Sequence, residues 1–283
     1  MSSHAPEKPP CRFAFARLVR RSEPEIDLAE AALLVAKEEY RELEVARYLA
    51  RLDEMAEAVR ARAGGVTDPQ ALTGWLNDYL FREQGFRGNT EDYYDPRNSF
   101  LNEVLDRRLG IPITLSTVYM EVGRRLGVPM HGVGMPGHFL VKCVTVDAEL
   151  VIDPFNQGAV VSPADCQRLL DQISGGKVTF EPRFLAPIGT RHILARMLNN
   201  LKAIYVNRQE FGKALGVVER LMLLDPESAT EIRDRGLLLF QLKRYPEAMA
   251  ELQRYLQRAG SAEDAETIRE HLGAIRQRVA SWN

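Results

Sequence analysis

The fold of this chain is decided by four segments in its middle third: Asn98-Ser99, Gly110-Ile111-Pro112-Ile113-Thr114-Leu115-Ser116, Pro136-Gly137-His138-Phe139-Leu140-Val141 and Ile152-Asp153-Pro154-Phe155. Pro112 suits the first turn of a helix, because a helix start leaves its backbone N–H groups unpaired and proline has none. Strand-like runs follow at residues 131–135, 138–145 and 149–153, with Pro136-Gly137 between the first two. One apolar helix that leads into several antiparallel strands predicts an α+β fold with a small sheet.

His138 and Asp153 are the candidates for acid–base chemistry. His138 is predicted early in one strand and Asp153 at the end of the next, so we expect their side chains within hydrogen-bond reach of each other. The carboxylate would fix the tautomer of the imidazole and raise its basicity. A nucleophile at the start of the preceding helix would complete a triad. The alternative is a structural histidine, with Asp153-Pro154 only ending a strand.

Other polar residues of the same region are candidate binding residues. They are Asn98, Glu103, Thr114, Ser116 and Asn156. Asn98 is also predicted to cap a short helix, and Glu103 either lines a cleft with the acidic loop 91–95 or is simply solvated. Thr114 and Ser116 carry hydroxyls near the start of the core helix, and either is a nucleophile only if it points toward the histidine.

The N-terminal part is predicted to be a tail followed by helices. Residues 1–21 form the tail, whose first eleven residues are polar and proline-rich and are expected to be disordered. The arginines and aromatic residues after them form either an interaction arm or a segment that packs on the body. Ser22-Glu23-Pro24-Glu25 is typical of a capping box before a buried helix. A third helix begins at Asp68-Pro69 and is predicted to bury Trp75.

The last third of the chain repeats. Ala214 and Ala248 lie 34 residues apart, each preceded by an aromatic residue three positions earlier. This is the period of the tetratricopeptide repeat, so residues 195–262 are predicted to form two units, with a capping helix over residues 262–280. We therefore expect three parts: the tail, a helical segment plus core over residues 22–189, and repeats over residues 190–283. Such repeats either bind a partner on a concave surface or only pack on the middle domain.

Composition excludes several classes of function. The chain has 37 basic and 39 acidic residues and a net charge of −2, so nothing indicates nucleic-acid binding. Three cysteines without a Cys-x-x-Cys pair argue against zinc fingers and fit a reducing compartment. No secretory signal or long apolar run is present, which predicts a cytoplasmic protein that does not span a membrane. His131 and His138 lack metal-ligand spacing, and no phosphate-binding glycine motif occurs, so we expect neither metal nor cofactor.

Together, the four segments, the preceding helices and the repeats resemble the SirB-type family of bacterial proteins over roughly residues 22–262. That family joins a transglutaminase-like, papain-related core to tetratricopeptide repeats, so the resemblance implies a mostly helical α+β protein of this architecture. Active transglutaminase-like enzymes carry Gly-x-Cys at the start of the core helix, whereas the matching triplet here is Gly110-Ile111-Pro112. Proline supplies no nucleophile, and none of the three cysteines is placed to replace it.

Three functions follow from these observations. The first, which we favour, is a non-catalytic protein that binds a protein or peptide partner through its repeats. The second is a hydrolase or acyl transferase in which His138 is the base, Asp153 orients it, and a hydroxyl or water is the nucleophile. The third is a sensor that binds a small ligand in the vestigial cleft.

Overall fold

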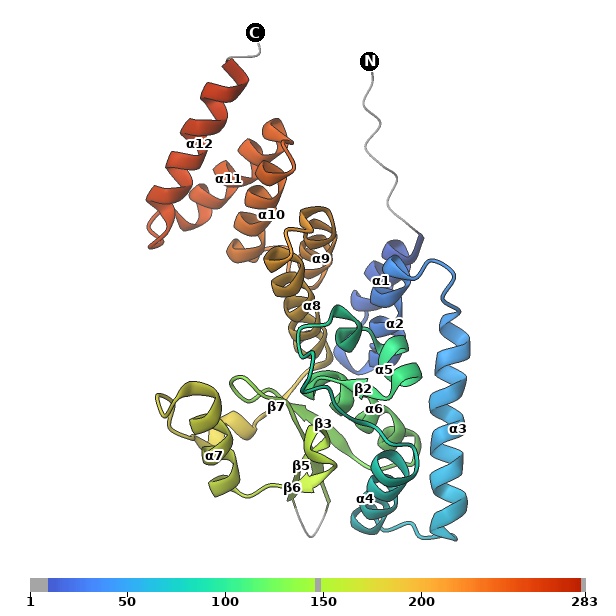
Figure 1. The fold of residues 1–283 in the computed structure, drawn as a ribbon. Coiled ribbons are helices and arrows are strands. Elements are labelled where there is room, and N and C mark those ends of the chain that lie inside the picture. The colour runs from blue at the N-terminus through green and yellow to red at the C-terminus, as the bar shows by residue number, and fades with distance from the viewer. Residues whose placement is uncertain (1–9, 146–148, 281–283) are drawn as a thin grey trace. The chain divides into compact units, whose positions relative to one another are not determined.

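The computed structural model describes residues 10–145 and 149–280 (Figure 1). The chain divides into two compact units, one ending at Met197 and the other beginning at Leu198. Both units are mostly helical, and the only sheets among the described residues lie in the first unit. The predicted α+β class with a small antiparallel sheet is therefore confirmed.

The first unit begins with five helices before its core helix. They are α1 (Pro10–Val19), α2 (Leu28–Glu39), α3 (Val45–Ala63), α4 (Pro69–Asn77) and α5 (Leu101–Arg107). Residues 10–19, predicted as part of the tail, thus form a helix, with Phe15 buried and Phe13 exposed. The first nine residues of the predicted tail lie outside the described residues. The capping box at Ser22 closes only a 3-10 turn, Glu23–Glu25, and α2 begins instead at Asp27, whose carboxylate accepts from the Glu30 N–H.

Two side chains differ from their predicted places. Trp75 is 39% exposed, because the buried face of α4 is narrow and centres on Leu72 and Leu76. Asn98 does not cap α5, which begins at Leu101 after a 3-10 turn, Pro96–Ser99. Its amide instead donates to the carbonyls of Asp92 (2.7 Å) and Tyr93 (3.2 Å) and so fixes the preceding loop.

The core helix α6 (Pro112–Arg125) is buried around its whole circumference from Pro112 to Gly123. It packs against α2, α3, α4 and α5 and against two strands of the sheet. The sequence predicted one inner face for this helix. The complete burial arises because helices and sheet enclose α6 from all sides, and it explains why the helix carries no charged residue before Glu121.

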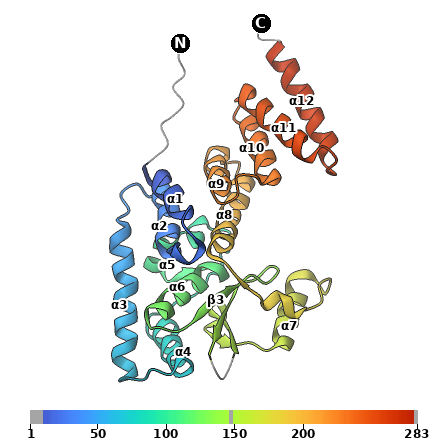
Figure 2. The ribbon, with the colours of Figure 1, turned by 180° about the vertical axis from the view of Figure 1, so that it is seen from behind.

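The main sheet has five strands in the order β6-β5-β4-β3-β7, and every neighbouring pair is antiparallel. Figure 2 shows the sheet from behind, with β3 labelled between α6 and α7. The strands are β3 (Met130–Val133), β4 (Leu140–Val144), β5 (Glu149–Asp153), β6 (Ala159–Val160) and β7 (Pro187–Ile188). In β4 and β5, Val141 lies opposite Ile152. A separate parallel pair, β1 (Arg87–Gly88) with β2 (Leu109–Gly110), lies just before α6.

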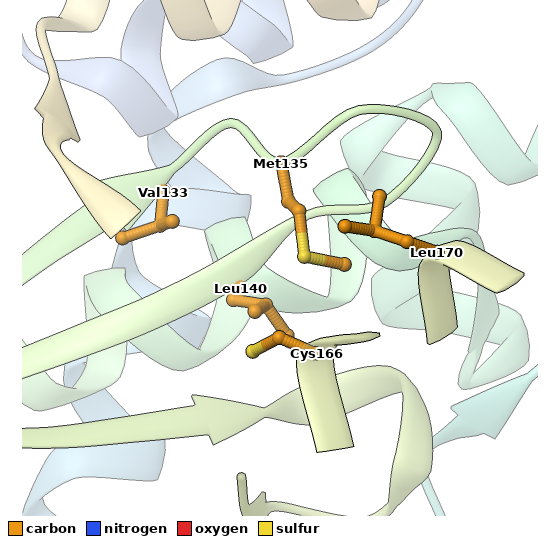
Figure 3. Packing of buried hydrophobic residues seen from close by; sticks show 5 residues of the cluster. All are labelled: Val133, Met135, Leu140, Cys166 and Leu170. Carbon is orange, nitrogen blue, oxygen red and sulfur yellow. The ribbon is translucent and has the colours of Figure 1, made fainter. Parts of the chain in front are cut away.

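A second small core lies under α7 (Pro163–Ser174). Leu140 of β4 packs there with Val133, Met135 and the α7 residues Cys166 and Leu170 (Figure 3). Cys143, an odd number of positions further along β4, lies instead beside Tyr119 of α6. The sheet is therefore covered by α6 on one face and by α7 on the other, as the alternation of side chains along a strand requires.

The second unit is an array of antiparallel helices. They are the end of α8 (Thr190–Asn207), then α9 (Phe211–Leu224), α10 (Ala229–Gln241), α11 (Tyr245–Ala259) and α12 (Ala265–Ala280). Ala214 and Ala248, which carry the repeat signal, are both completely buried. Gly236 of α10 lies against Leu252 of α11 so closely that a Cβ atom would come within 2.6 Å of the leucine. The repeat positions are therefore helix-packing positions, and α12 occupies the place predicted for the capping helix.

Candidate functional site

His138 and Asp153 are in direct contact. The distance from His138 Nε2 to Asp153 Oδ2 is 2.9 Å, and both side chains are buried. Asp153 is the last residue of β5, as expected, whereas His138 follows the Pro136-Gly137 turn and precedes β4 by two residues. The turn allows this because Gly137 has a φ of +69°, a conformation that residues with a Cβ atom rarely adopt.

The Asp153 carboxylate is saturated with hydrogen bonds. Oδ1 accepts from the backbone N–H groups of Phe155 (3.0 Å) and Asn156 (3.3 Å), and Oδ2 accepts from the Asn156 side-chain amide (2.7 Å) as well as from the histidine. Asp153 therefore caps the 3-10 turn Pro154–Asn156 and holds the imidazole at the same time. Of the predicted binding residues, Asn156 is the one that joins this pair.

The second ring nitrogen of His138 has no hydrogen-bond partner among the described residues and retains a small solvent-accessible surface. Nε2 must carry the proton, since its partner is a carboxylate, and the lone pair therefore lies on Nδ1. Among the described residues, the buried polar atoms without a hydrogen-bond partner do not include Nδ1, and nothing bonds to it. Although His138 is only 6% exposed, Nδ1 is thus accessible as a base or as a hydrogen-bond acceptor.

The hydroxyls near the start of α6 bond to main-chain groups and not to this histidine. Pro112 is its first residue and is buried. The Thr114 hydroxyl donates to the Asn98 carbonyl (2.7 Å) and accepts from the Ile111 N–H (3.1 Å), so it serves the helix start. The Ser116 hydroxyl is completely buried and lies 3.4 Å from the Phe139 carbonyl oxygen. Neither hydroxyl contacts the imidazole.

The other predicted residues lie apart from the pair. Asn98 is buried in the loop before α5, where its Oδ1 accepts from the Asn89 amide (3.0 Å). Glu103 of α5 lies beside Tyr40, and burial together with this carboxylate raises the pKa of the Tyr40 phenol. Asn98 and Glu103 therefore belong to the packing of the helical segment.

The thiols are also unsuited to catalysis. Cys143 and Cys166 are completely buried, and burial raises the pKa of both thiols. A nucleophilic cysteine requires the opposite, a lowered pKa and access to substrate. Cys11 is buried in α1. Within residues 10–145 and 149–280, no group of three or more His, Cys, Asp or Glu side chains could hold a metal ion.

Sequence reasoning missed the residues that surround the pair. Arg196 of α8 donates from Nη2 to the carbonyls of Met135 (3.1 Å) and His138 (2.9 Å). Phe155 meets the imidazole edge-on at a centroid distance of 6.0 Å, and Tyr93 meets Phe155 in the same way at 6.4 Å. No local pattern indicates Arg196, which lies 58 residues from His138 along the chain, whereas Phe155 belongs to the segment Ile152–Phe155 that the sequence already singled out. Only the fold of the sheet brings them together.

The repeat unit carries a separate groove of about 510 Å³. Its lining comes from α8, α9 and α10 and consists of Asn199, Lys202, Ala203, Val206, Phe211, Asp234, Leu237, Leu238 and Gln241. At one edge, the Lys202 ammonium bonds to both Glu231 and Asp234 at 2.9 Å. Burial acts to lower the pKa of Lys202, but these hydrogen bonds outweigh it and raise the pKa, so the ammonium stays charged.

Models of known protein families match both units of the chain. Residues 46–199 match the model of the transglutaminase-like superfamily, and residues 201–273 match that of the tetratricopeptide repeat. No helix in the described ranges is long and apolar enough to cross a membrane.

Similar proteins occur in several bacteria and in animals. A UPF0162 protein of Xylella fastidiosa is 38% identical over 87% of this chain and 89% of its own length, and one of Pseudomonas aeruginosa is 33% identical over 76% and 78%. F-box only protein 21 of Mus musculus is 33% identical over 53% of this chain but only 23% of its own length. The chain therefore belongs to the transglutaminase-like superfamily, in the UPF0162 or SirB-type family whose members continue into tetratricopeptide repeats.

Proposed function

We propose that this protein is a non-catalytic binding protein, whose transglutaminase-like core lacks a nucleophile and whose repeats hold a protein or peptide partner. The observation that carries the proposal is the start of α6, where Pro112 stands in the place of the catalytic cysteine. The hydroxyls of Thr114 and Ser116 are directed to main-chain carbonyls, and the buried thiols are poor nucleophiles. Covalent acyl transfer needs an activated nucleophile beside the histidine, and none stands there.

The groove of the repeat unit supports a peptide as the partner. Its floor is apolar, with Val206 42% exposed at its edge. The ion cluster beside it joins two cations, Lys202 and Arg233, to three carboxylates, those of Glu231, Asp234 and Asp264. The cluster therefore has one net negative charge. A segment with apolar residues and a basic flank complements both features of the groove.

Peptide selection tests the binding half of the proposal. The full-length chain is used to enrich peptides from a random displayed library, and the enriched sequences are synthesised and their affinities measured. We expect apolar peptides with at least one Lys or Arg, whose affinity is lost in Val206→Glu. The matched control is Val66→Glu in the first unit, a valine of similar exposure at 39%. Peptides that bind both variants as tightly as the wild type would place the binding surface elsewhere and contradict the proposal.

Activity assays test the non-catalytic half. Amide hydrolysis and amine incorporation are measured on generic peptides before and after complete alkylation of the thiols, and we expect no turnover in either case. Turnover that alkylation abolishes would show that a cysteine acts as the nucleophile.

One observation favours a second candidate, a hydrolase that activates water. The open Nδ1 of His138, oriented by Asp153, has the geometry of a general base. Turnover that survives alkylation and is lost in His138→Ala would establish this alternative in place of the non-catalytic proposal.

A further inference from the structure

Arg196 lies against the turn that presents His138. Both Nη2 hydrogen atoms are used by the carbonyls of Met135 and His138, and the guanidinium lies over the Phe139 ring at 5.5 Å from its centroid. The guanidinium occupies space that a side chain at residue 134 would take, since a Cβ atom there would lie 2.7 Å from Nη1. The guanidinium is thus held in one place by two main-chain carbonyls and by the ring of Phe139.

The charge of Arg196 has no carboxylate partner. Within the described ranges, no Asp or Glu oxygen lies within ion-pair distance of it. Arg191, one and a half turns earlier on the same helix, shows the usual arrangement, because it pairs with Glu23 and also donates to the carbonyls of Val19 and Arg21. Burial lowers the pKa of Arg196, which agrees with a cation that is only partly compensated.

Three donors of Arg196 remain available. A guanidinium has five N–H groups, and the two on Nη2 are already used. The buried polar atoms without a partner in the described part of the chain do not include Nε or Nη1 of this residue. These nitrogens therefore have some solvent-accessible surface, and an N–H of Nη1 or Nε can donate a single charged hydrogen bond to an oxygen of a carboxylate or phosphate.

An aromatic surface adjoins these donors. Ring contacts run from Tyr94 to Tyr93 (5.3 Å), from Tyr93 to Phe155 (6.4 Å) and from Phe155 to His138 (6.0 Å). Tyr94 is 70% exposed, so this series of rings leads from the surface to the imidazole. Tyr93 also lies close enough to Arg196 for their charges to interact.

We propose that Arg196 is the centre of an oxyanion-binding site beside His138, which takes the carboxylate or phosphate of a ligand whose aromatic or apolar part contacts Tyr93 and Phe155. The site lies in the first unit and does not depend on the groove of the repeats. Its ligand is bound without covalent chemistry. The two sources of the anion, an acidic peptide end or a phosphate ester, share the same recognition by the guanidinium.

Calorimetric titration of the full-length protein tests the site with three probes: N-acetylphenylalanine, its uncharged amide, and phenyl phosphate. We expect saturable binding of at least one anion and weaker binding of the amide. Arg196→Met should weaken the anion roughly tenfold or more, the usual effect of removing a charged hydrogen bond, and should leave the amide unchanged. Arg191→Met is the matched control on α8 and should not alter either affinity. The anion that binds more tightly shows whether the natural ligand presents a carboxylate or a phosphate ester.

A second variant separates binding from folding. Gly134→Ala keeps the arginine but places a methyl group against Nη1, so the guanidinium must shift and the anion should bind more weakly. If Arg196→Met does not fold, this variant tests whether Arg196 binds the anion. Equal affinity for acid and amide, absence of saturable anion binding, or wild-type affinity in a folded Arg196→Met or Gly134→Ala protein would each overturn the proposal.

Discussion

Replacing Asp153 measures how much its carboxylate contributes to the free energy of unfolding of the first unit. Its carboxylate accepts from the His138 ring, from the N–H groups of Phe155 and Asn156 and from the Asn156 amide. Asp153→Ala leaves two or three of these donors buried without a partner. Each unsatisfied donor costs about 1–3 kcal/mol, so the free energy of unfolding should fall by about 3–5 kcal/mol.

Asp153→Asn should have a smaller effect. The side-chain oxygen of the new asparagine can still accept from the two backbone N–H groups. Its NH2 group, however, faces the NH2 group of Asn156, and two donors cannot bond to each other, so one of them loses its partner. We expect a loss of about 1–2 kcal/mol. Asp92→Asn, at an exposed carboxylate that takes part in no side-chain hydrogen bond or ion pair of the described residues, is the control and should change stability very little.

Urea unfolding measures these differences in the first unit alone. The chain has two tryptophans, so Trp282→Phe in every variant leaves Trp75 of α4 as the sole reporter. Free energies are compared only where the denaturant slope is unchanged, because a changed slope indicates loss of two-state behaviour. An Asp153→Ala protein within about 1 kcal/mol of the wild type would refute the reasoning, since the carboxylate would then hold nothing in place.

Three further outcomes follow from single sites. Burial acts to raise the pKa of Asp95, but the hydrogen bonds from Arg97 outweigh it and lower the pKa below the ordinary value of 3.8. The contribution of Asp95 to stability is therefore present above pH 3.8 and is lost as the pH falls through the folded pKa. Urea titrations at decreasing pH should show a shallower loss of stability for Asp95→Asn than for the wild type. Gly88→Ala should destabilise the first unit, seen as a lower thermal midpoint, because the new Cβ would lie 2.4 Å from the Phe155 ring. Cys143 and Cys166 are buried with raised thiol pKa values, so mass spectrometry should find them unmodified by iodoacetamide until the protein is unfolded.

The elements that the sequence predicted best are those with a local physical cause. Pro112 begins α6 because a helix start tolerates the missing N–H, and the Pro136-Gly137 turn separates β3 from β4 because Gly137 adopts a positive φ. The repeat signal at Ala214 and Ala248 reflects positions where only a small side chain fits between helices. Each of these signals depends on neighbours that are close in sequence.

Predictions that depended on distant neighbours were less successful. Asn98 is a residue type common at helix N-caps, but its side-chain oxygen accepts from the Asn89 amide instead, and α5 begins later. Trp75 fits the helical period of α4, yet the packed face is too narrow to cover it. Arg196 could not be assigned to the His138 turn at all, because its partners are main-chain carbonyls, which carry no residue-specific signal.

The contact between His138 and Asp153 is not by itself evidence for catalysis. Three of the four groups that bond to Asp153 belong to the turn that follows it, so the carboxylate would be required there even without an imidazole. An open ring nitrogen does not by itself exclude a structural histidine, because a nitrogen buried without a partner would lose its hydrogen bond to water and cost free energy. The open Nδ1 belongs to the Pro136-Gly137 turn region, and Arg196 of α8 donates to two carbonyls of that region without a carboxylate partner among the described residues. Under the function proposed above, Pro112 replaces the nucleophile and such a site has no covalent step, but these two polar groups stay available to a ligand, which is the physical reason to look for binding there as well as in the groove of the repeats.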